Sequence, residues 1–326
     1  MSDRVFITRK IADEGIQLLS KSVECDVWQD PMPPSREELL QRSRGCTGLL
    51  TMLSDRIDGE LMDAIGNQLK VVCNYAVGYN NIDVAAAEAR QVAVGNTPDV
   101  LTDATADLAV TLLLAAARRV PEGIQNVADH EWQTWEPLGL IGSDLKNATV
   151  GIVGMGRIGF ATAQRLHGGW GMKVVYTARS DKAEANQQLG AERVEFEDLL
   201  KRSDFISIHT DLNPKTSRLF DASAFEAMKT NCVLVNTARG GVIDQDALAD
   251  ALRRQTIFAA GLDVTEPEPL PADSSLRGLP NCVILPHIGS ATLKTRNDMA
   301  SIAARNIIAG LKGEDLPCPV VSKING

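Results

Sequence analysis

Reactive side chains follow three short apolar runs of the sequence. His287 follows NCVILP, Arg239 follows VLVNTA, and two acids, Glu266 and Glu268, follow AAGLDVT. A histidine can donate a proton, an arginine can stabilise an oxygen that gains negative charge, and a carboxylate can hold the histidine in its charged form. Singly, the histidine is as well explained by a structural role, the arginine by a salt bridge and each acid by a solvated loop. Together the three stretches predict an acid–base site.

A glycine-rich stretch, VGIVGMGRIG, lies upstream of these residues. Its glycines Gly154, Gly156 and Gly159 fit GxGxxG directly after an apolar strand and at the start of an amphipathic helix. The first glycine permits a tight turn, the second lets a pyrophosphate approach the backbone, and the third lets helix and strand pack closely. Arg157 and Ile158 complete the motif at the helix N-terminus, where N–H groups face phosphates. The motif predicts a dinucleotide site, the alternative being a glycine-rich turn without a ligand.

The residues after the next strand candidate, MKVVYT, bear on which dinucleotide is bound. An NAD-preferring site usually offers Asp or Glu here, whereas this chain has Thr177, Arg179 and Ser180. A guanidinium can pair with the 2′-phosphate of NADP, and the hydroxyls can add hydrogen bonds. We therefore predict NADP(H) as the preferred cofactor, with NAD(H) possible. In the alternative, Arg179 is only a solvated charge and Asp181 reaches the ribose of NAD.

Short β-branched runs alternate with stretches of helical period along most of the chain, which is typical of doubly wound α/β proteins with parallel sheets. The segment 102–120 predicts one long buried helix that ends before Pro121 and is able to join two domains. At the carboxyl edge of a parallel sheet the polar residues above would meet. The strand candidates are RVFIT, GLLTM, KVVCN and VAVGN, then ATVGIVG, MKVVYT, DFISIH, NCVLVNT, FAAGLDV and NCVILPH.

The composition excludes several classes of protein. A chain of 326 residues is expected to form two domains. The net charge of −9 argues against nucleic acid or an anionic membrane as partner. No apolar run approaches the roughly 20 residues of a membrane span, and no signal sequence is recognised, so a cytoplasmic location is expected. The six cysteines form no CxxC pair or Cys/His cluster, so neither a metal site nor a disulfide framework is expected.

The chain has only four histidines, so each can be weighed. His130 and His167 lie in polar or glycine-flanked helical stretches and are expected at the surface or at a helix end. His209 ends the strand candidate DFISIH and is expected to touch cofactor without doing chemistry. His287 therefore remains the candidate proton donor.

With these motifs the sequence resembles the D-isomer-specific 2-hydroxyacid dehydrogenases, most closely their glyoxylate/hydroxypyruvate reductase branch. The resemblance rests on VGIVGMGRIG, NTARGGVIDQDAL, AAGLDVTEPEPLP and NCVILPHIGSATLKTRN and runs nearly end to end. It implies an NAD(P)-dependent enzyme that reduces small 2-oxo acids, such as glyoxylate and hydroxypyruvate, to D-2-hydroxy acids. It also implies a dinucleotide-binding Rossmann domain, 103–291, inserted into a flavodoxin-like substrate domain made of 1–102 and 292–326.

The resemblance also implies roles for individual residues. Arg239 would bind the substrate carboxylate and carbonyl, His287 would donate the proton, and Glu268 rather than Glu266 would pair with His287. Asp263 would hold the nicotinamide carboxamide. Further residues are expected at the cofactor (Thr105, Thr210, Pro214, Ala238 and Gly289), and others at the substrate: the backbone of Val77 and Gly78, and the side chain of Leu53.

The segment ADHEWQTWEPLGLIGSDLKN is similar to an arm that wraps a partner subunit, and it carries Trp132 and Trp135. We therefore expect a homodimer, the alternative being that both tryptophans pack within their own domain. Gly139 stands where the reductase branch can have a further aromatic residue, which leaves open a larger 2-oxo acid such as a ketogluconate. Phosphoglycerate or formate dehydrogenation and a dinucleotide-sensing corepressor-like protein remain alternatives.

Overall fold

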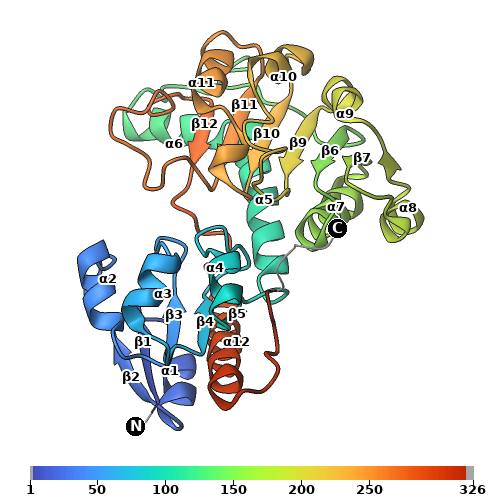
Figure 1. Cartoon of the computed structure of the whole chain (residues 1–326). Coiled ribbons are helices and arrows are strands. Elements are labelled where there is room, and N and C mark those ends of the chain that lie inside the picture. The colour runs from blue at the N-terminus through green and yellow to red at the C-terminus, as the bar shows by residue number, and fades with distance from the viewer. Residues whose placement is uncertain (1–2, 321–326) are drawn as a thin grey trace. The chain divides into compact units, whose positions relative to one another are not determined.

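The computed structural model describes residues 3–320, which divide into two compact units. One unit comprises residues 3–101 and 290–320, and the other comprises Thr102–Gly289. Each unit is built on its own sheet, and every pair of neighbouring strands in both sheets is parallel (Figure 1). The α/β class with two parallel-sheet units is therefore confirmed.

The smaller unit has a five-stranded sheet in the order β2-β1-β3-β4-β5, the order of flavodoxin-like folds. Helix α12, from near the C-terminus, returns to pack beside α1 on this sheet. The strands are β1 (Arg4–Ile7), β2 (Glu24–Val27), β3 (Gly48–Thr51), β4 (Val71–Asn74) and β5 (Ala93–Gly95). The helices are α1 (Asp13–Ser20), α2 (Arg36–Ser43), α3 (Gly59–Ile65), α4 (Val84–Ala89) and α12 (Leu293–Lys312).

The larger unit has a seven-stranded sheet in the order β12-β11-β10-β9-β6-β7-β8. Successive strands are added on one side of β6 up to β8, and from β9 onward they are added on its other side, so the strand order switches between β6 and β9. In open α/β sheets ligands bind outside the carboxyl ends of the strands at such a point. The strands are β6 (Thr149–Val153), β7 (Lys173–Thr177), β8 (Glu192–Arg193), β9 (Phe205–Ile208), β10 (Val233–Asn236), β11 (Ala259–Leu262) and β12 (Cys282–Ile284). The helices are α5 (Thr102–Ala117), α6 (Val120–Ala128), α7 (Arg157–Trp170), α8 (Ala183–Leu189), α9 (Phe196–Arg202), α10 (Ala222–Ala227), α11 (Gln245–Arg253) and the short 3-10 helix η1 (Gly240–Val242).

The sheet of the larger unit is covered on both faces, which explains why its strands read as nearly continuous apolar runs. Apolar side chains of α5, α7 and α8 pack in a core on one face, and those of α9, α10 and α11 pack in a core on the other. Leu113 and Ile152 are fully buried in the first core, and Leu234 and Leu248 in the second. This packing fixes the strand ends on which the polar residues lie.

The helix expected over 102–120 is shorter and is followed by a second one. Helix α5 ends at Ala117, and Arg119 has a left-handed backbone with φ of 52°. Helix α6 then begins with Pro121 in its first turn, where the missing N–H of proline leaves no gap in the helical hydrogen bonds. The strands β2 and β8 were not expected either, because both lie at sheet edges and neither is an apolar buried run.

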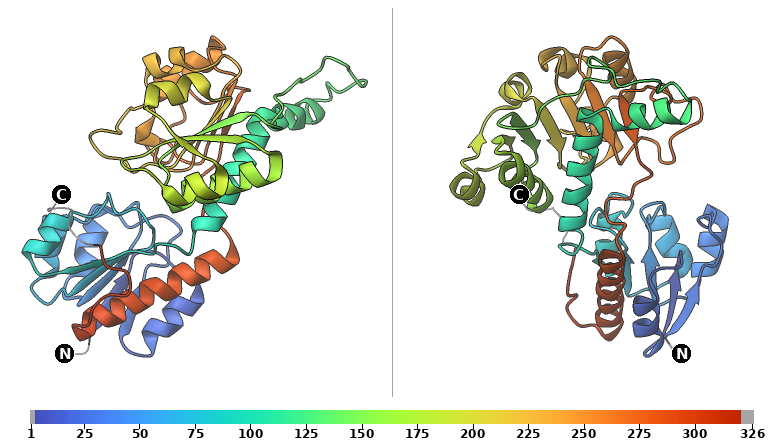
Figure 2. Two further views of the ribbon diagram at one scale, coloured as in Figure 1. Left: turned by 90° about the vertical axis from the view of Figure 1, so that its right-hand side faces the viewer. Right: turned by 180° about the vertical axis from the view of Figure 1, so that it is seen from behind.

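The segment between α6 and β6, residues 129–148, projects from its unit as a long arm (Figure 2). The large apolar side chains between residues 132 and 141 are exposed in the single chain, with Trp135 81% and Leu138 82% accessible, whereas Leu145 packs in the core of the unit. Within residues 3–320, no helix combines the length and the apolar character needed to span a membrane.

Candidate active site

The polar residues singled out above follow neighbouring strands of the larger sheet. Arg239 follows β10, Asp263 directly follows β11, and His287 follows β12. The last strand ends at Ile284, so His287 lies in the turn beyond the strand rather than at its end as expected. Parallel pairing brings these three segments to one edge of the sheet.

His287 and Glu268 form a hydrogen-bonded pair. Nδ1 of His287 lies 2.7 Å from Oε2 of Glu268, and Oε1 of the same carboxylate accepts the backbone N–H of Thr265 at 3.1 Å. Burial raises the pKa of Glu268, but the hydrogen bond and charge of His287, the Thr265 amide and the charge of Arg239 outweigh it, so the pKa lies below its usual value. An ionised Glu268 requires a proton on Nδ1, and Nε2 of His287 is then the nitrogen left to face a substrate.

Asp263 holds the turn that presents His287. Its two carboxylate oxygens accept the backbone N–H groups of Ile288 and Gly289, each at 2.7 Å. The side chain is 1% exposed, and burial raises the pKa of this carboxyl against the lowering effect of the two amides and of His287. His287 itself has a positive φ of 55°, an uncommon conformation that the two hydrogen bonds beside it help to maintain.

Arg239 lies on a loop that packs against the loop of Glu268. Asn236, at the end of β10, donates its amide to the carbonyl of Arg239 at 2.9 Å and accepts the N–H of Ala238 at 2.9 Å. A Cβ atom at Gly240 would lie 2.0 Å from the carbonyl carbon of Thr265, so only glycine allows the two loops this close. Burial lowers the pKa of Arg239, while the charges of Glu268 and Asp211 raise it, and the guanidinium remains a cation.

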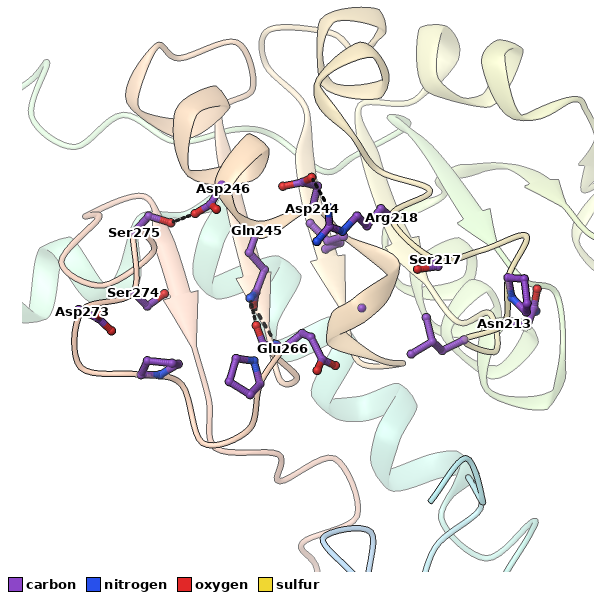
Figure 3. A pocket seen from close by; sticks show the side chains of 16 residues that line it. Asn213, Ser217, Arg218, Asp244, Gln245, Asp246, Glu266, Asp273, Ser274 and Ser275 are labelled. Carbon is purple, nitrogen blue, oxygen red and sulfur yellow. Dashed lines mark hydrogen bonds and ion pairs between the residues drawn. The ribbon is translucent and has the colours of Figure 1, made fainter. Parts of the chain in front are cut away.

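Gln245, at the start of α11, holds the backbone of the loop that carries Glu268. Its side-chain amide donates to the carbonyl of Glu266 and accepts the N–H of Glu266 at 3.0 Å (Figure 3). The cavity drawn there is about 840 Å³ and is lined also by Arg218, Asp244 and Ser275. None of the acid–base residues lines it, so it lies beside the reaction centre and is not the reaction site itself.

The glycine-rich turn leaves room for a pyrophosphate. Gly154 has a φ of 98°, and a Cβ atom there would lie 2.6 Å from the carbonyl oxygen of His209. A Cβ atom at Gly156 would meet no atom within 4 Å, and within the described residues no side chain caps the N-terminus of α7. The open space at Gly156 and the uncapped N-terminus of this 14-residue helix fit an anionic dinucleotide backbone.

The turn after β7 places basic and hydroxyl side chains at the surface. Arg179 and Ser180 are exposed, and Arg193 of β8 donates to the carbonyl of Ala178 at 3.0 Å, which brings a second guanidinium to this turn. Asp181 is also exposed, but its carboxylate is bonded to Tyr176 and Asn186. The acid is thus part of a local network between β7 and α8.

The other histidines differ from His287 in their surroundings. Nε2 of His209 lies 2.8 Å from the hydroxyl of Ser207, and burial lowers the pKa of His209 to about 3, so this side chain is neutral and does not donate a proton near pH 7. His167 lies in the last turn of α7 with Nδ1 2.9 Å from the carbonyl oxygen of Met172. His130 is exposed beyond α6.

In the smaller unit, the loop after β4 carries Val77 and Gly78, and that after β3 carries Leu53. Two consecutive carbonyls of the β4 loop are bound by the residues that follow β5: Thr97 N–H binds that of Ala76 at 2.9 Å, and the side-chain amide of Asn96 binds that of Val77 at 2.8 Å. The side-chain amide of Asn74 binds the carbonyl of Gly78 at 2.7 Å. In a trans peptide the N–H points opposite to the carbonyl of the preceding residue. The N–H groups of Val77 and Gly78 therefore point away from Asn96 and Thr97, as an anion-binding loop requires.

Comparison with known proteins identifies the family. Residues 110–289 match the model described as D-isomer specific 2-hydroxyacid dehydrogenase, NAD binding domain. The chain belongs to this family. It is 47% identical to glyoxylate reductase of Thermococcus litoralis over 99% of this chain and 98% of that protein. It is 45% identical to glyoxylate reductase/hydroxypyruvate reductase of Homo sapiens over 96% of each chain.

A solved structure of this D-2-hydroxyacid dehydrogenase family agrees. The NADPH-dependent glyoxylate/hydroxypyruvate reductase of Sinorhizobium meliloti, in complex with NADP and malonate, matches with a TM-score of 0.83 and 31% identity, over 98% of this chain and 97% of that one. The resemblance to the glyoxylate/hydroxypyruvate reductases is confirmed, and the chain is an oxidoreductase of the family with an NAD-binding domain.

The structure of this family member gathers most of the expected site residues at one sheet edge. Thr105 and Gly289 lie close to Asp263, and Thr210 and Pro214 lie in the loop after β9, with Pro214 lining the cavity of Figure 3. Sequence reasoning missed the residues that hold the loops, namely Asn74, Asn96, Asn236 and Gln245. Their side chains bind backbone groups distant in sequence or in turns, and no local pattern signals such contacts.

Proposed function

We propose that this enzyme reduces small 2-oxo acids, such as glyoxylate and hydroxypyruvate, to D-2-hydroxy acids with NADPH. The observation that carries the proposal is the 2.7 Å pair of His287 and Glu268 beside Arg239, in the same unit as the glycine-rich turn. The relatives above support the substrate class, because they are glyoxylate and hydroxypyruvate reductases. The alternative of a larger 2-oxo acid, raised by Gly139, remains part of the test.

In this mechanism a bound nicotinamide dinucleotide supplies the hydride. Nε2 of His287 donates its proton to the carbonyl oxygen of the substrate, and Glu268 stabilises the imidazolium through Nδ1. Arg239 binds the substrate beside this oxygen and stabilises the negative charge that develops on it. Asp263 keeps the histidine turn in place, so that the proton donor is positioned before the reaction begins.

We also propose that the β4 loop of the smaller unit binds a substrate carboxylate through the N–H groups of Val77 and Gly78. The support is that the adjacent residues Asn96 and Thr97 bind the carbonyls of Val77 and Ala76, which turns the N–H groups of Gly78 and Val77 away from them. Leu53, after β3, would limit the size of the substrate side chain.

Preference for NADPH is supported by the turn after β7. Arg179, Ser180 and Thr177 offer a guanidinium and hydroxyls to a 2′-phosphate, and the reductase of Sinorhizobium meliloti is described as NADPH-dependent. Measured rates with NADPH and with NADH decide this preference.

Initial rates test the proposal. Glyoxylate, hydroxypyruvate and 2-ketogluconate would be reduced with NADPH and with NADH at equal subsaturating concentration. We expect the highest kcat/KM for a small acid with NADPH. Faster reduction of 2-ketogluconate would move the substrate to the larger class, faster rates with NADH would overturn the cofactor preference, and no turnover of any acid would overturn the function.

We propose a cytoplasmic homodimer in which the arm 129–148 covers apolar surface of the partner. The support is the exposure of Trp132, Trp135 and Leu138, which are 68%, 81% and 82% accessible in the single chain. Light scattering at micromolar concentration should give twice the chain mass, and a monomeric mass would contradict the arm's role.

A further inference from the structure

We propose that Tyr176 is a specificity-determining residue, whose buried hydroxyl holds the carboxylate of Asp181 away from the ribose of the dinucleotide. This inference rests on the proposed reductase function and on its NADPH preference. It explains how a site can keep an acid in the turn after β7 and still accept a 2′-phosphate.

The hydroxyl of Tyr176 is the centre of a small polar network. It lies 2.8 Å from Oδ1 of Asp181 and 3.0 Å from Oδ1 of Asn186, and it accepts the backbone N–H of Lys182 at 2.8 Å. Asn186, on α8, donates to both carboxylate oxygens of Asp181, at 2.9 and 3.0 Å. Each oxygen of the acid thus has a partner within the segment 176–186.

The burial of Tyr176 anchors this network to the core of the unit. The residue lies in β7, has no exposed surface and belongs to the core beneath α5 and α7. Its ring therefore fixes where the hydroxyl lies, and the hydroxyl fixes the turn through Lys182 and Asp181. The hydrogen bonds from Asn186 and Tyr176 lower the pKa of Asp181, so the carboxylate stays ionised and bonded at neutral pH.

This arrangement separates the negative and positive groups of the turn. Asp181 is the only acid between β7 and α8, and its bonds direct it toward α8. Arg179 and Ser180 remain exposed, and Arg193 is bonded to the backbone of the same turn. A carboxylate without these hydrogen bonds would accept a hydrogen bond from the 2′-hydroxyl of NAD and would repel the 2′-phosphate of NADP. Holding it back therefore favours the phosphorylated dinucleotide.

Tyr176→Phe tests the inference because it removes the hydroxyl and keeps the buried ring. Dissociation constants for NADPH and NADH would be measured by equilibrium titration of nucleotide fluorescence, without substrate. We expect the ratio Kd(NADH)/Kd(NADPH) to fall by about tenfold or more, the size of one hydrogen bond to a charged group. In Tyr176→Phe/Asp181→Asn the ratio should return to the wild-type value, because the released carboxylate is the agent.

Two further variants keep the test interpretable. Asn186→Ala releases Asp181 from the helix side and should lower the ratio in the same direction. Gln188→Ala on the same helix, whose side chain forms hydrogen bonds with Gln164 and Glu184 and not with the Tyr176 network, should leave the ratio unchanged. An unchanged ratio in Tyr176→Phe, or a fall that persists when Asp181 is also replaced, would overturn the inference.

The wild-type ratio separates this inference from the cofactor preference. If the wild type prefers NADPH and Tyr176→Phe leaves the ratio unchanged, only the role of Tyr176 fails. If the wild type shows no preference but releasing Asp181 still lowers the ratio, the role of Tyr176 stands and the preference fails. A wild-type preference for NADH that is lost in Asp181→Asn would overturn both.

Discussion

The carboxyl ends of β10 to β12 and the carboxyl end of β7 are built in different ways. At the first, each reactive residue is held through buried or backbone contacts: Asp263 binds two amides, and Gly240 packs on Thr265. At the second, Arg179 and Ser180 are exposed, and the turn is hydrogen-bonded to a buried side chain, Tyr176, through Asp181 and the backbone N–H of Lys182.

This difference separates reaction from cofactor choice. Proton transfer needs a donor placed to within fractions of an ångström, and the surrounding loops supply that precision. Choice between NADPH and NADH needs only a change of charge at an exposed turn. Substitutions at the first region should therefore change turnover, and substitutions at the second should change the ratio of affinities for the two nucleotides.

Replacing His287 gives the largest expected effect. It tests whether the reaction region acts on turnover without acting on nucleotide binding. In His287→Gln no group at this position donates the proton, so kcat for 2-oxo acid reduction should fall by roughly 10²-fold or more. The Kd for NADPH should stay near that of the wild type. Unchanged turnover would remove this residue from the mechanism, and lost nucleotide binding would show that the two regions are not separate.

Arg179→Ala is the matching change in the exposed region. Loss of a charge-assisted hydrogen bond to the 2′-phosphate should raise Kd for NADPH by about tenfold to a hundredfold, with little change for NADH. Saturating kcat should be preserved. An equal loss of affinity for both nucleotides would instead mean that the guanidinium contacts a part that they share.

The pH dependence sharpens the account of the reaction region. Reduction consumes the proton of His287, so kcat/KM should fall as pH rises and the imidazolium is lost. The lowered pKa of Glu268 means that the carboxylate stays charged down to pH values below the usual range for Glu, so the pair should persist on the acid side. Glu268→Gln removes the partner charge and should move the alkaline fall to lower pH by about one unit.

A rate profile from pH 6 to 9 checks this prediction. The position of the alkaline fall in Glu268→Gln relative to the wild type is the decisive quantity. A flat wild-type profile would contradict proton donation, and coincident falls in both proteins would show that Glu268 does not favour the imidazolium.

Gln245→Ala should give the smallest effect of the four. Loss of its two hydrogen bonds to Glu266 loosens the loop that carries Glu268, and kcat should fall by about threefold to tenfold, the size of a net hydrogen bond. The alkaline fall should also move to lower pH, which a purely structural defect would not produce. Ser275→Ala, which breaks only the 2.8 Å contact with Asp246 beside the same cavity, is the matched control and should keep the wild-type profile.

Much of this architecture could be predicted from the sequence. Apolar strand runs and the glycine-rich turn indicated the parallel sheets, and the polar residues beyond them indicated where chemistry would lie. The pairing of Glu268 rather than Glu266 with His287 came only from the family resemblance, because both acids lie in the same loop. Spacing alone does not show which of two nearby acids turns toward a given partner.

The parts that were missed have a common physical cause. Edge strands such as β8 have no buried apolar pattern, and Pro121 was taken only as the end of a helix although it also begins one. Contacts such as Asn96 with Val77 depend on tertiary packing between loops. These features are set by three-dimensional proximity, which a single sequence does not record.

Asp263 also sets a timescale for the turn that carries His287. The side chain of Ile288 is 37% exposed, yet its amide and that of Gly289 are bonded to a carboxylate that is 1% exposed. Amides in exposed turns usually exchange with deuterated water through small local openings. These two amides exchange only when Asp263 releases them, so their exchange rate reports how often the proton donor leaves its working position, in the absence of substrate and nucleotide.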